Sequence, residues 1–142
     1  AVDDAELVRG LERVGDLAVN VAERAAYLAR HEPLGIRLDF ARMGEAALKM
    51  VNDCLEALVH LDTDLAKQVI NADQVVDDLN RDMFMALQEL MKDDPAVIER
   101  AIHFLSASRH LERIGDHATN IAEDVLFLVE GIVVRHQHEE YE

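Results

Sequence analysis

The sequence predicts an all-α protein, in which an antiparallel three-helix bundle is preceded by one extra long helix. Half of the 142 residues are hydrophobic but only 4% are aromatic, so aliphatic side chains, which helices accept readily, would fill the core. Apolar residues recur at helical spacing along most of the chain, and both prolines fall where this pattern is interrupted. A chain of this length is expected to form one compact domain around a single core.

The first helix is predicted over residues 3–30. Apolar residues recur there on one side at helical spacing. The segment HEPLGIR, which contains Pro33 and Gly35, ends the pattern because both residue types disfavour a continued helix. Residues 31–37 are therefore expected to be a linker.

Two further helices are predicted in the middle of the chain. Asp39 is the expected N-cap of the second helix, whose apolar side continues until the segment HLDTD near residue 61. Asp62 or Thr63 then caps a third helix, which keeps one apolar stripe up to the segment KDDP.

The fourth helix is predicted to begin around Pro95 and to end at Gly131, since proline suits a first helical turn and glycine commonly follows a last one. Short loops favour antiparallel neighbours, so residues 38–131 are expected to form an up-down-up bundle. The remainder, residues 132–142, is expected to be a flexible acidic tail.

The composition excludes several classes of partner. A formal net charge of −15 would repel nucleic acids and anionic membrane surfaces, which makes a cation the natural small ligand. The chain has one cysteine, Cys54, and no apolar run approaches the roughly 20 residues of a membrane span. The expected location is the cytoplasm, either free or peripheral at the inner membrane through protein partners.

One stretch of sequence occurs twice. LERIGDHATNIAEDVLFL, residues 111–128, matches LERVGDLAVNVAERAAYL, residues 11–28, at ten of eighteen positions, which indicates an internal duplication. If the last helix completes a three-helix unit, residues 1–30 are expected to be the third helix of an incomplete first unit. The helices that would precede it are absent, and we expect that an upstream segment has been removed.

The duplicated stretch carries an acidic arc on the side away from its apolar face. At about 100° per residue, its four polar positions fall within roughly 80° of one another. These positions are Glu112, Asp116, Asn120 and Glu123 in the second copy and Glu12, Asp16, Asn20 and Glu23 in the first. A solvated helix face is the simpler interpretation, and pairing with Arg13 or Arg113 is another. Both copies nevertheless place the same residues at the same offsets, although carboxylates four residues apart repel one another.

The third helix offers a matching pair of carboxylates. Asp73 and Asp77 are also four residues apart, and Asn80 follows close by. Two such pairs on adjoining helices would form an oxygen-rich cation site, suited to Mg²⁺, Mn²⁺, iron or Ca²⁺. The spacing alone does not choose among these ions.

These motifs resemble the PhoU family of phosphate-transport accessory proteins. That family is built from two repeats of a three-helix bundle, each marked by acidic E(D)xxxD motifs, and the resemblance covers nearly all of residues 1–131. It implies multinuclear iron or zinc sites. A homodimer is expected for another reason: the apolar residues of the first helix lack the helices that should cover them, so the chain either self-associates or folds this helix onto its own bundle. The residues that match the family's metal motifs are Asp73, Asp77, Glu112 and Asp116, with Glu12 and Asp16 in the other copy.

The resemblance also implies a function. Family members are negative regulators of phosphate uptake and of phosphate-starvation signalling, and they link a phosphate ABC transporter to a sensor histidine kinase. The alternative is a structural helical adaptor whose acidic face binds a basic partner, with metal incidental. A ferritin-like di-iron protein would need inward Glu-x-x-His pairs, which the chain lacks. Because no nucleophile or phosphate-binding loop is recognisable, we expect no enzymatic activity.

Overall fold

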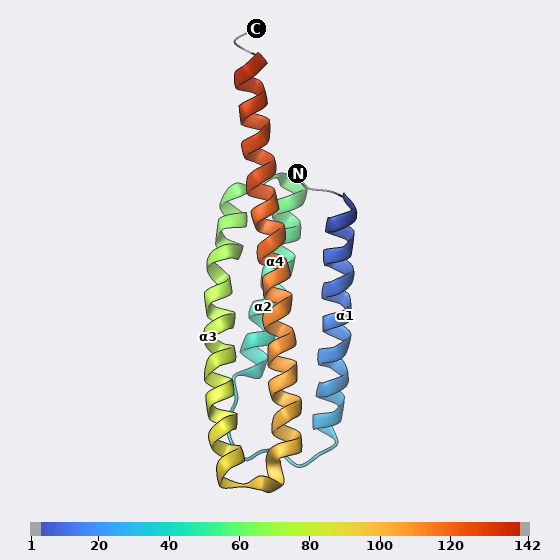
Figure 1. Cartoon of the computed structure of the whole chain (residues 1–142), viewed down its shortest axis with the longest axis vertical. Coiled ribbons are helices and arrows are strands. Elements are labelled where there is room, and N and C mark those ends of the chain that lie inside the picture. Colours follow the sequence, from blue (N-terminus) through green and yellow to red (C-terminus); the bar gives the residue numbers. More distant parts are fainter. Residues whose placement is uncertain (1–3, 140–142) are drawn as a thin grey trace.

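Four α-helices make up most of the described chain, as predicted, and the described residues contain no strand (Figure 1). The computed structural model describes residues 4–139, with side chains described for residues 4–132. The helices are α1 (Asp4–Ala29), α2 (Phe40–His60), α3 (Thr63–Asp93) and α4 (Ile98–Glu139), and a short 3-10 helix, Pro95–Val97, leads into α4.

Local signals set several of these boundaries. The Asp62 carboxylate accepts a hydrogen bond from the Leu65 backbone N–H at 3.0 Å and so caps α3, as predicted. Asp94 caps the turn that starts with Pro95 in the same way, by accepting from the Ala96 N–H at 3.0 Å. Asp39 occupies the N-cap position of α2, but its side chain makes no capping hydrogen bond.

The predicted end of the last helix at Gly131 is wrong, because α4 continues to Glu139. One glycine costs a helix only about 1 kcal/mol relative to alanine, and the residues that follow it do not break helices. The C-terminal part of α4 projects beyond the ends of the other helices (Figure 1). Residues 140–142 of the predicted tail lie outside the described residues.

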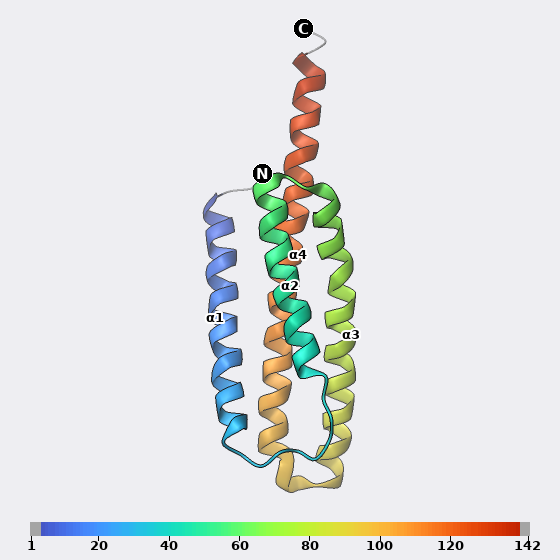
Figure 2. The ribbon, with the colours of Figure 1, turned by 180° about the vertical axis from the view of Figure 1, so that it is seen from behind.

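Helices α2, α3 and α4 run up, down and up around the main core, as predicted (Figures 1 and 2). Its fully buried side chains come from all three helices and include Met43, Met50, Val69, Val76 and Val125. Burying each such aliphatic side chain contributes roughly 1.5–3 kcal/mol. The core therefore fixes how the faces of α3 and α4 meet.

Helix α1 packs on the bundle through α4 and runs antiparallel to it. Near the end of α1, the Tyr27 ring stacks on the His103 ring at 3.7 Å, and Arg24 donates to His103 Nδ1 at 3.0 Å. The linker that follows crosses the end of the bundle (Figure 2) and is held by Arg100, which donates to the Glu32 and Pro33 carbonyls. The chain thus folds its first helix back onto its own bundle.

The two copies of the duplicated helix bury different faces. Leu17 is buried in α1, whereas Ala18 and Ala22 are exposed. Their equivalents Ala118 and Ala122 are completely buried in the core shared with α2 and α3. The alanine side of α1 stays open because α1 contacts α4 alone among the described helices.

Candidate metal centre

Three aspartates from two helices converge on the outer side of the α3/α4 contact. Asp73 and Asp77 lie one turn apart on α3, and Asp116 faces them from α4. One carboxylate oxygen from each lies within 4.8 Å of the other two. Three of the four predicted carboxylates therefore meet in the fold, because antiparallel packing brings these turns to the same height.

Glu112 lies beside the three aspartates, one turn before Asp116 on α4. Its Oε2 accepts a hydrogen bond from the Asn80 amide nitrogen of α3 at 2.8 Å. Asn80 was predicted as a possible further ligand, but here its amide is directed at a carboxylate. The protein thus presents four carboxylates at one place, of which one has a defined hydrogen-bond donor.

No basic side chain forms an ion pair with the four acids within the described residues. Arg13 and Arg113, which could have paired with the acidic arcs, form no ion pair there. The ion pairs of the described residues are Lys49–Asp53, Arg81–Asp78 and Lys92–Glu89. The charge of Arg81 lowers the pKa of Asp77 and that of Arg109 lowers the pKa of Glu112, but burial and the neighbouring acids outweigh both effects.

This arrangement perturbs the carboxyl groups. Burial, followed by the neighbouring charges of Asp77, Asp116 and Glu112, raises the pKa of Asp73 to about 6. Burial also raises the pKa values of Asp77 and Glu112, with Asp116 adding to both. Asp73 Oδ1 is buried and has no hydrogen-bond partner among the described residues. A buried carboxylate oxygen of this kind is costly unless a cation or donor meets it.

Gly115 makes room for that oxygen. A Cβ atom at Gly115 would lie 3.3 Å from Asp73 Oδ1, which is tighter than ordinary contact, and 3.5 Å from the Met50 sulfur, which is ordinary contact. The equivalent Gly15 of α1 has nothing within 4 Å of the same position. Sequence reasoning overlooked Gly115, although a glycine inside both copies of a helix, at a cost of about 1 kcal/mol each, was an available signal.

The first copy of the motif is not assembled into a site. Glu12, Asp16 and Glu23 are exposed on α1, and Asn20 accepts a hydrogen bond from Arg24 of its own helix at 3.1 Å. Glu12 and Asp16 are predicted metal residues, but within the described part of the chain the group that could hold an ion is the three-aspartate one. The reason is topological, since the described chain packs no helix against the acidic side of α1 as α3 packs against that of α4.

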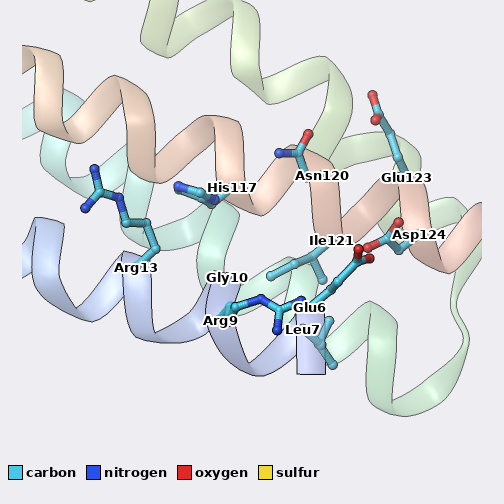
Figure 3. A pocket seen from close by; sticks show the side chains of 10 residues that line it. All are labelled: Glu6, Leu7, Arg9, Gly10, Arg13, His117, Asn120, Ile121, Glu123 and Asp124. Carbon is cyan, nitrogen blue, oxygen red and sulfur yellow. The ribbon is translucent and has the colours of Figure 1, made fainter. Parts of the chain in front are cut away.

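Asn120 and Glu123 lie apart from the three aspartates. Both are exposed and line a hollow of about 670 Å³ along the contact between α1 and α4 (Figure 3). Its walls also carry Arg9, Arg13 and His117, so the hollow is mixed in charge. Glu6 and Asp124 point toward each other there, and the pKa of Asp124 is raised by burial and then by Glu6.

The residues of the cluster fit a hard cation. All donors are carboxylate oxygens, one of them buried without a partner, and Gly115 keeps the space beside it open. A multivalent cation would meet the orphaned oxygen and offset the mutual repulsion of the four acids.

Replacing Gly115 with alanine tests the role of the space beside Asp73. The added Cβ must displace Asp73 Oδ1 or Met50, so we expect weaker metal binding and no gain in stability. Gly15→Ala is the matched control, because it gains up to about 1 kcal/mol of helix propensity in open space. Metal titration and chemical unfolding of both variants measure the difference. Equal behaviour of the two variants would contradict this role.

The pKa of Asp73 predicts how the metal-free chain responds to pH. The folded-state pKa of Asp73 is about 6, above the ordinary 3.8. The contribution of the protonated Asp73 carboxyl group to the free energy of unfolding is therefore complete below about pH 4 and is lost as the pH rises through about 6. With a chelator present, the parent chain should lose more stability than Asp73→Asn over this range. Denaturant unfolding at several pH values checks this, with the exposed Asp82→Asn as control. Parallel pH profiles for the parent and Asp73→Asn would rule it out.

Known proteins with similar sequences belong to the family that the duplicated acidic motif resembles. The family model described as PhoU domain matches residues 40–125. A phosphate-specific transport system accessory protein PhoU homolog of Aquifex aeolicus is 44% identical over 133 residues, covering 94% of this chain and 60% of that protein. The Pseudomonas aeruginosa homolog of the same name is 44% identical over 131 residues, covering 89% and 52%.

A solved structure is similar as well. The crystal structure of PhoU from Pseudomonas aeruginosa aligns with a TM-score of 0.83 at 40% identity, over 89% of this chain and 61% of that one. This chain therefore spans between half and two thirds of the length of these relatives. Their names describe accessory proteins and not enzymes, in agreement with the prediction of no enzymatic activity. With a family match over more than half of its residues and a shared helical fold, this chain belongs to the PhoU domain family.

Proposed function

We propose that this chain is a metal-binding negative regulator of phosphate uptake and of phosphate-starvation signalling, linking a phosphate ABC transporter to a sensor histidine kinase. The names of its relatives, which place them in a phosphate-specific transport system, support the transport side of this role. The observation that carries the metal-binding part is the convergence of Asp73, Asp77 and Asp116 within 4.8 Å, with no ion pair to a basic side chain among the described residues.

In this proposal Asp73, Asp77, Asp116 and Glu112 hold the metal. The bound ion supplies positive charge that fastens α3 to α4. An oxygen-only donor set favours hard cations, so iron, Mn²⁺, Mg²⁺ or Ca²⁺ suit it better than zinc, which usually takes nitrogen or sulfur ligands. A ligand present at 100 times its dissociation constant stabilises the folded state by about 2.7 kcal/mol. Metal occupancy would thereby set how firmly the two helices present their outer face.

The alternative is an adaptor whose acidic face binds a basic surface of a partner, with metal incidental. The net charge of −15 and the unpaired carboxylates on α3 and α4 support this reading too. The two readings differ in what the aspartates do, because an adaptor needs their charge but not their convergence around an ion.

Substitution of Asp77 and Asp116 separates these functions. We expect Asp77→Asn and Asp116→Asn to lower the metal content of protein purified without added metal, whereas Asp16→Asn and Glu12→Gln on α1 should leave it unchanged. Elemental analysis measures the content and identifies the ion. Strains that carry the same variants should show constitutive phosphate-starvation output that disappears when the kinase is deleted. Unchanged metal content in both α3/α4 variants would remove the ligand assignment, and lost metal with normal regulation would make the ion structural.

We also propose that the chain forms a homodimer through α1 and works in the cytoplasm or peripherally at the inner membrane through protein partners. Ala18 and Ala22 are exposed on α1, next to an apolar groove that includes Val14, Val21 and Val51. An open apolar face of this kind favours association. The described residues contain no helix long and apolar enough to cross a membrane.

Light scattering over a concentration series tests the dimer. The parent chain should approach twice its 16.0 kDa mass as the concentration rises. Ala18→Glu, which places a charge on the open face, should keep it at the monomer mass, and Glu23→Gln on the exposed acidic side should not. A parent chain that stays monomeric throughout the series would exclude this interface.

A further inference from the structure

Ser108 is a polar side chain in an apolar setting. It is 1% exposed and is the buried polar residue of the described core. A buried hydroxyl costs free energy unless it forms a hydrogen bond. Ser108 Oγ lies 2.6 Å from Asn80 Oδ1 and 3.3 Å from the Met43 sulfur. The short distance to an amide oxygen, which can only accept, makes Ser108 the donor to Asn80.

The Glu112 carboxylate fixes the direction of the Asn80 amide. Because a carboxylate oxygen only accepts, the Asn80 nitrogen faces Glu112 Oε2, to which it donates at 2.8 Å, and the amide oxygen accepts from Ser108. The two hydrogen bonds run from α4 to α3 and back to α4, between residues one helical turn apart on α4. We call these two bonds the Ser108–Asn80 relay.

Glu112 needs such a restraint. Burial, and then the charges of Asp77 and Asp116, raise the pKa of Glu112, whereas the Asn80 hydrogen bond and then the charge of Arg109 lower it. Asn80 and Glu112 also line a hollow of about 490 Å³ beside Phe84 and Ile102. A glutamate repelled by two aspartates could swing into this open space. The amide hydrogen bond opposes that movement and keeps the carboxylate beside the three aspartates.

We propose that Ser108 and Asn80 are positioning residues that hold Glu112 at the edge of the three-aspartate group and so set the metal affinity of the centre. This inference rests on the proposed metal-binding function. Groups that hydrogen-bond to ligands typically change metal affinity by 10 to 100-fold when they are removed. The relay would act in this way although neither of its residues touches the ion.

Titration with Mn²⁺ alone tests the relay. Asn80→Ala and Ser108→Ala should each weaken Mn²⁺ binding by about 10 to 100-fold. The double variant should bind Mn²⁺ no less tightly than the single variant with the lower affinity, because both substitutions break the same pair of hydrogen bonds. In a Glu112→Gln background, the Asn80 and Ser108 substitutions should have no further effect. Ser108→Thr, which keeps the hydroxyl, should restore most of the affinity, and Ser106→Ala on the same helix is the control.

The outcomes separate this inference from the function it rests on. If Asp77→Asn and Asp116→Asn abolish Mn²⁺ binding while Asn80→Ala and Ser108→Ala bind within twofold of the parent, the relay is refuted and the metal centre stands. Relay effects that persist in the Glu112→Gln background would also overturn it, since they would reflect general loosening of the α3/α4 contact. If every aspartate variant binds Mn²⁺ as tightly as the parent chain, the metal centre itself is refuted. Ser108→Ala deletes one oxygen atom, so it keeps the test usable where Asn80→Ala folds poorly.

Discussion

The central constraint in this structure is the packing of α3 against α4, which holds four carboxylates together in spite of their repulsion. The apolar sides of both helices are buried in the same core, with Val76 and Ile121 among their contributions. That burial, at roughly 1.5–3 kcal/mol for each large aliphatic side chain, outweighs the cost of placing like charges side by side. The protein thereby spends folding free energy to keep a site that favours a cation, and burial of Asp73 Oδ1 is the clearest sign of this compromise.

The parts of the fold that follow from local patterns were predictable. Asp62 and Pro95 mark helix starts through their own backbone chemistry, and short loops required antiparallel neighbours. The convergence of Asp73 and Asp77 with Asp116 followed from the same reasoning, because an i, i+4 pair on each of two adjoining helices can meet at one height. The end of α4 did not follow, since the weak penalty of Gly131 is a poor guide when nothing else stops the helix.

The role of a residue could not be predicted from the sequence where that role depends on which residue of another helix contacts it. The acidic residues Glu12 and Asp16 repeat Glu112 and Asp116, yet in the described chain only the second pair has a neighbouring helix that carries partners. Asn80 looked like a candidate ligand, and in the fold its amide bridges the Glu112 carboxylate and the buried Ser108 hydroxyl. In each case the identity of the residue was informative, while its role was decided by a contact from a distant part of the chain.

The contact between α1 and α4 differs at its two ends. At one end Tyr27 is stacked between His31 and His103, and Arg100 holds the linker carbonyls. At the other end Glu6 and Asp124 repel one another beside a wide hollow. Thermal opening of the α1/α4 contact would therefore begin at the N-terminal turns of α1, where two acids meet, and reach the end held by Tyr27 and Arg100 last.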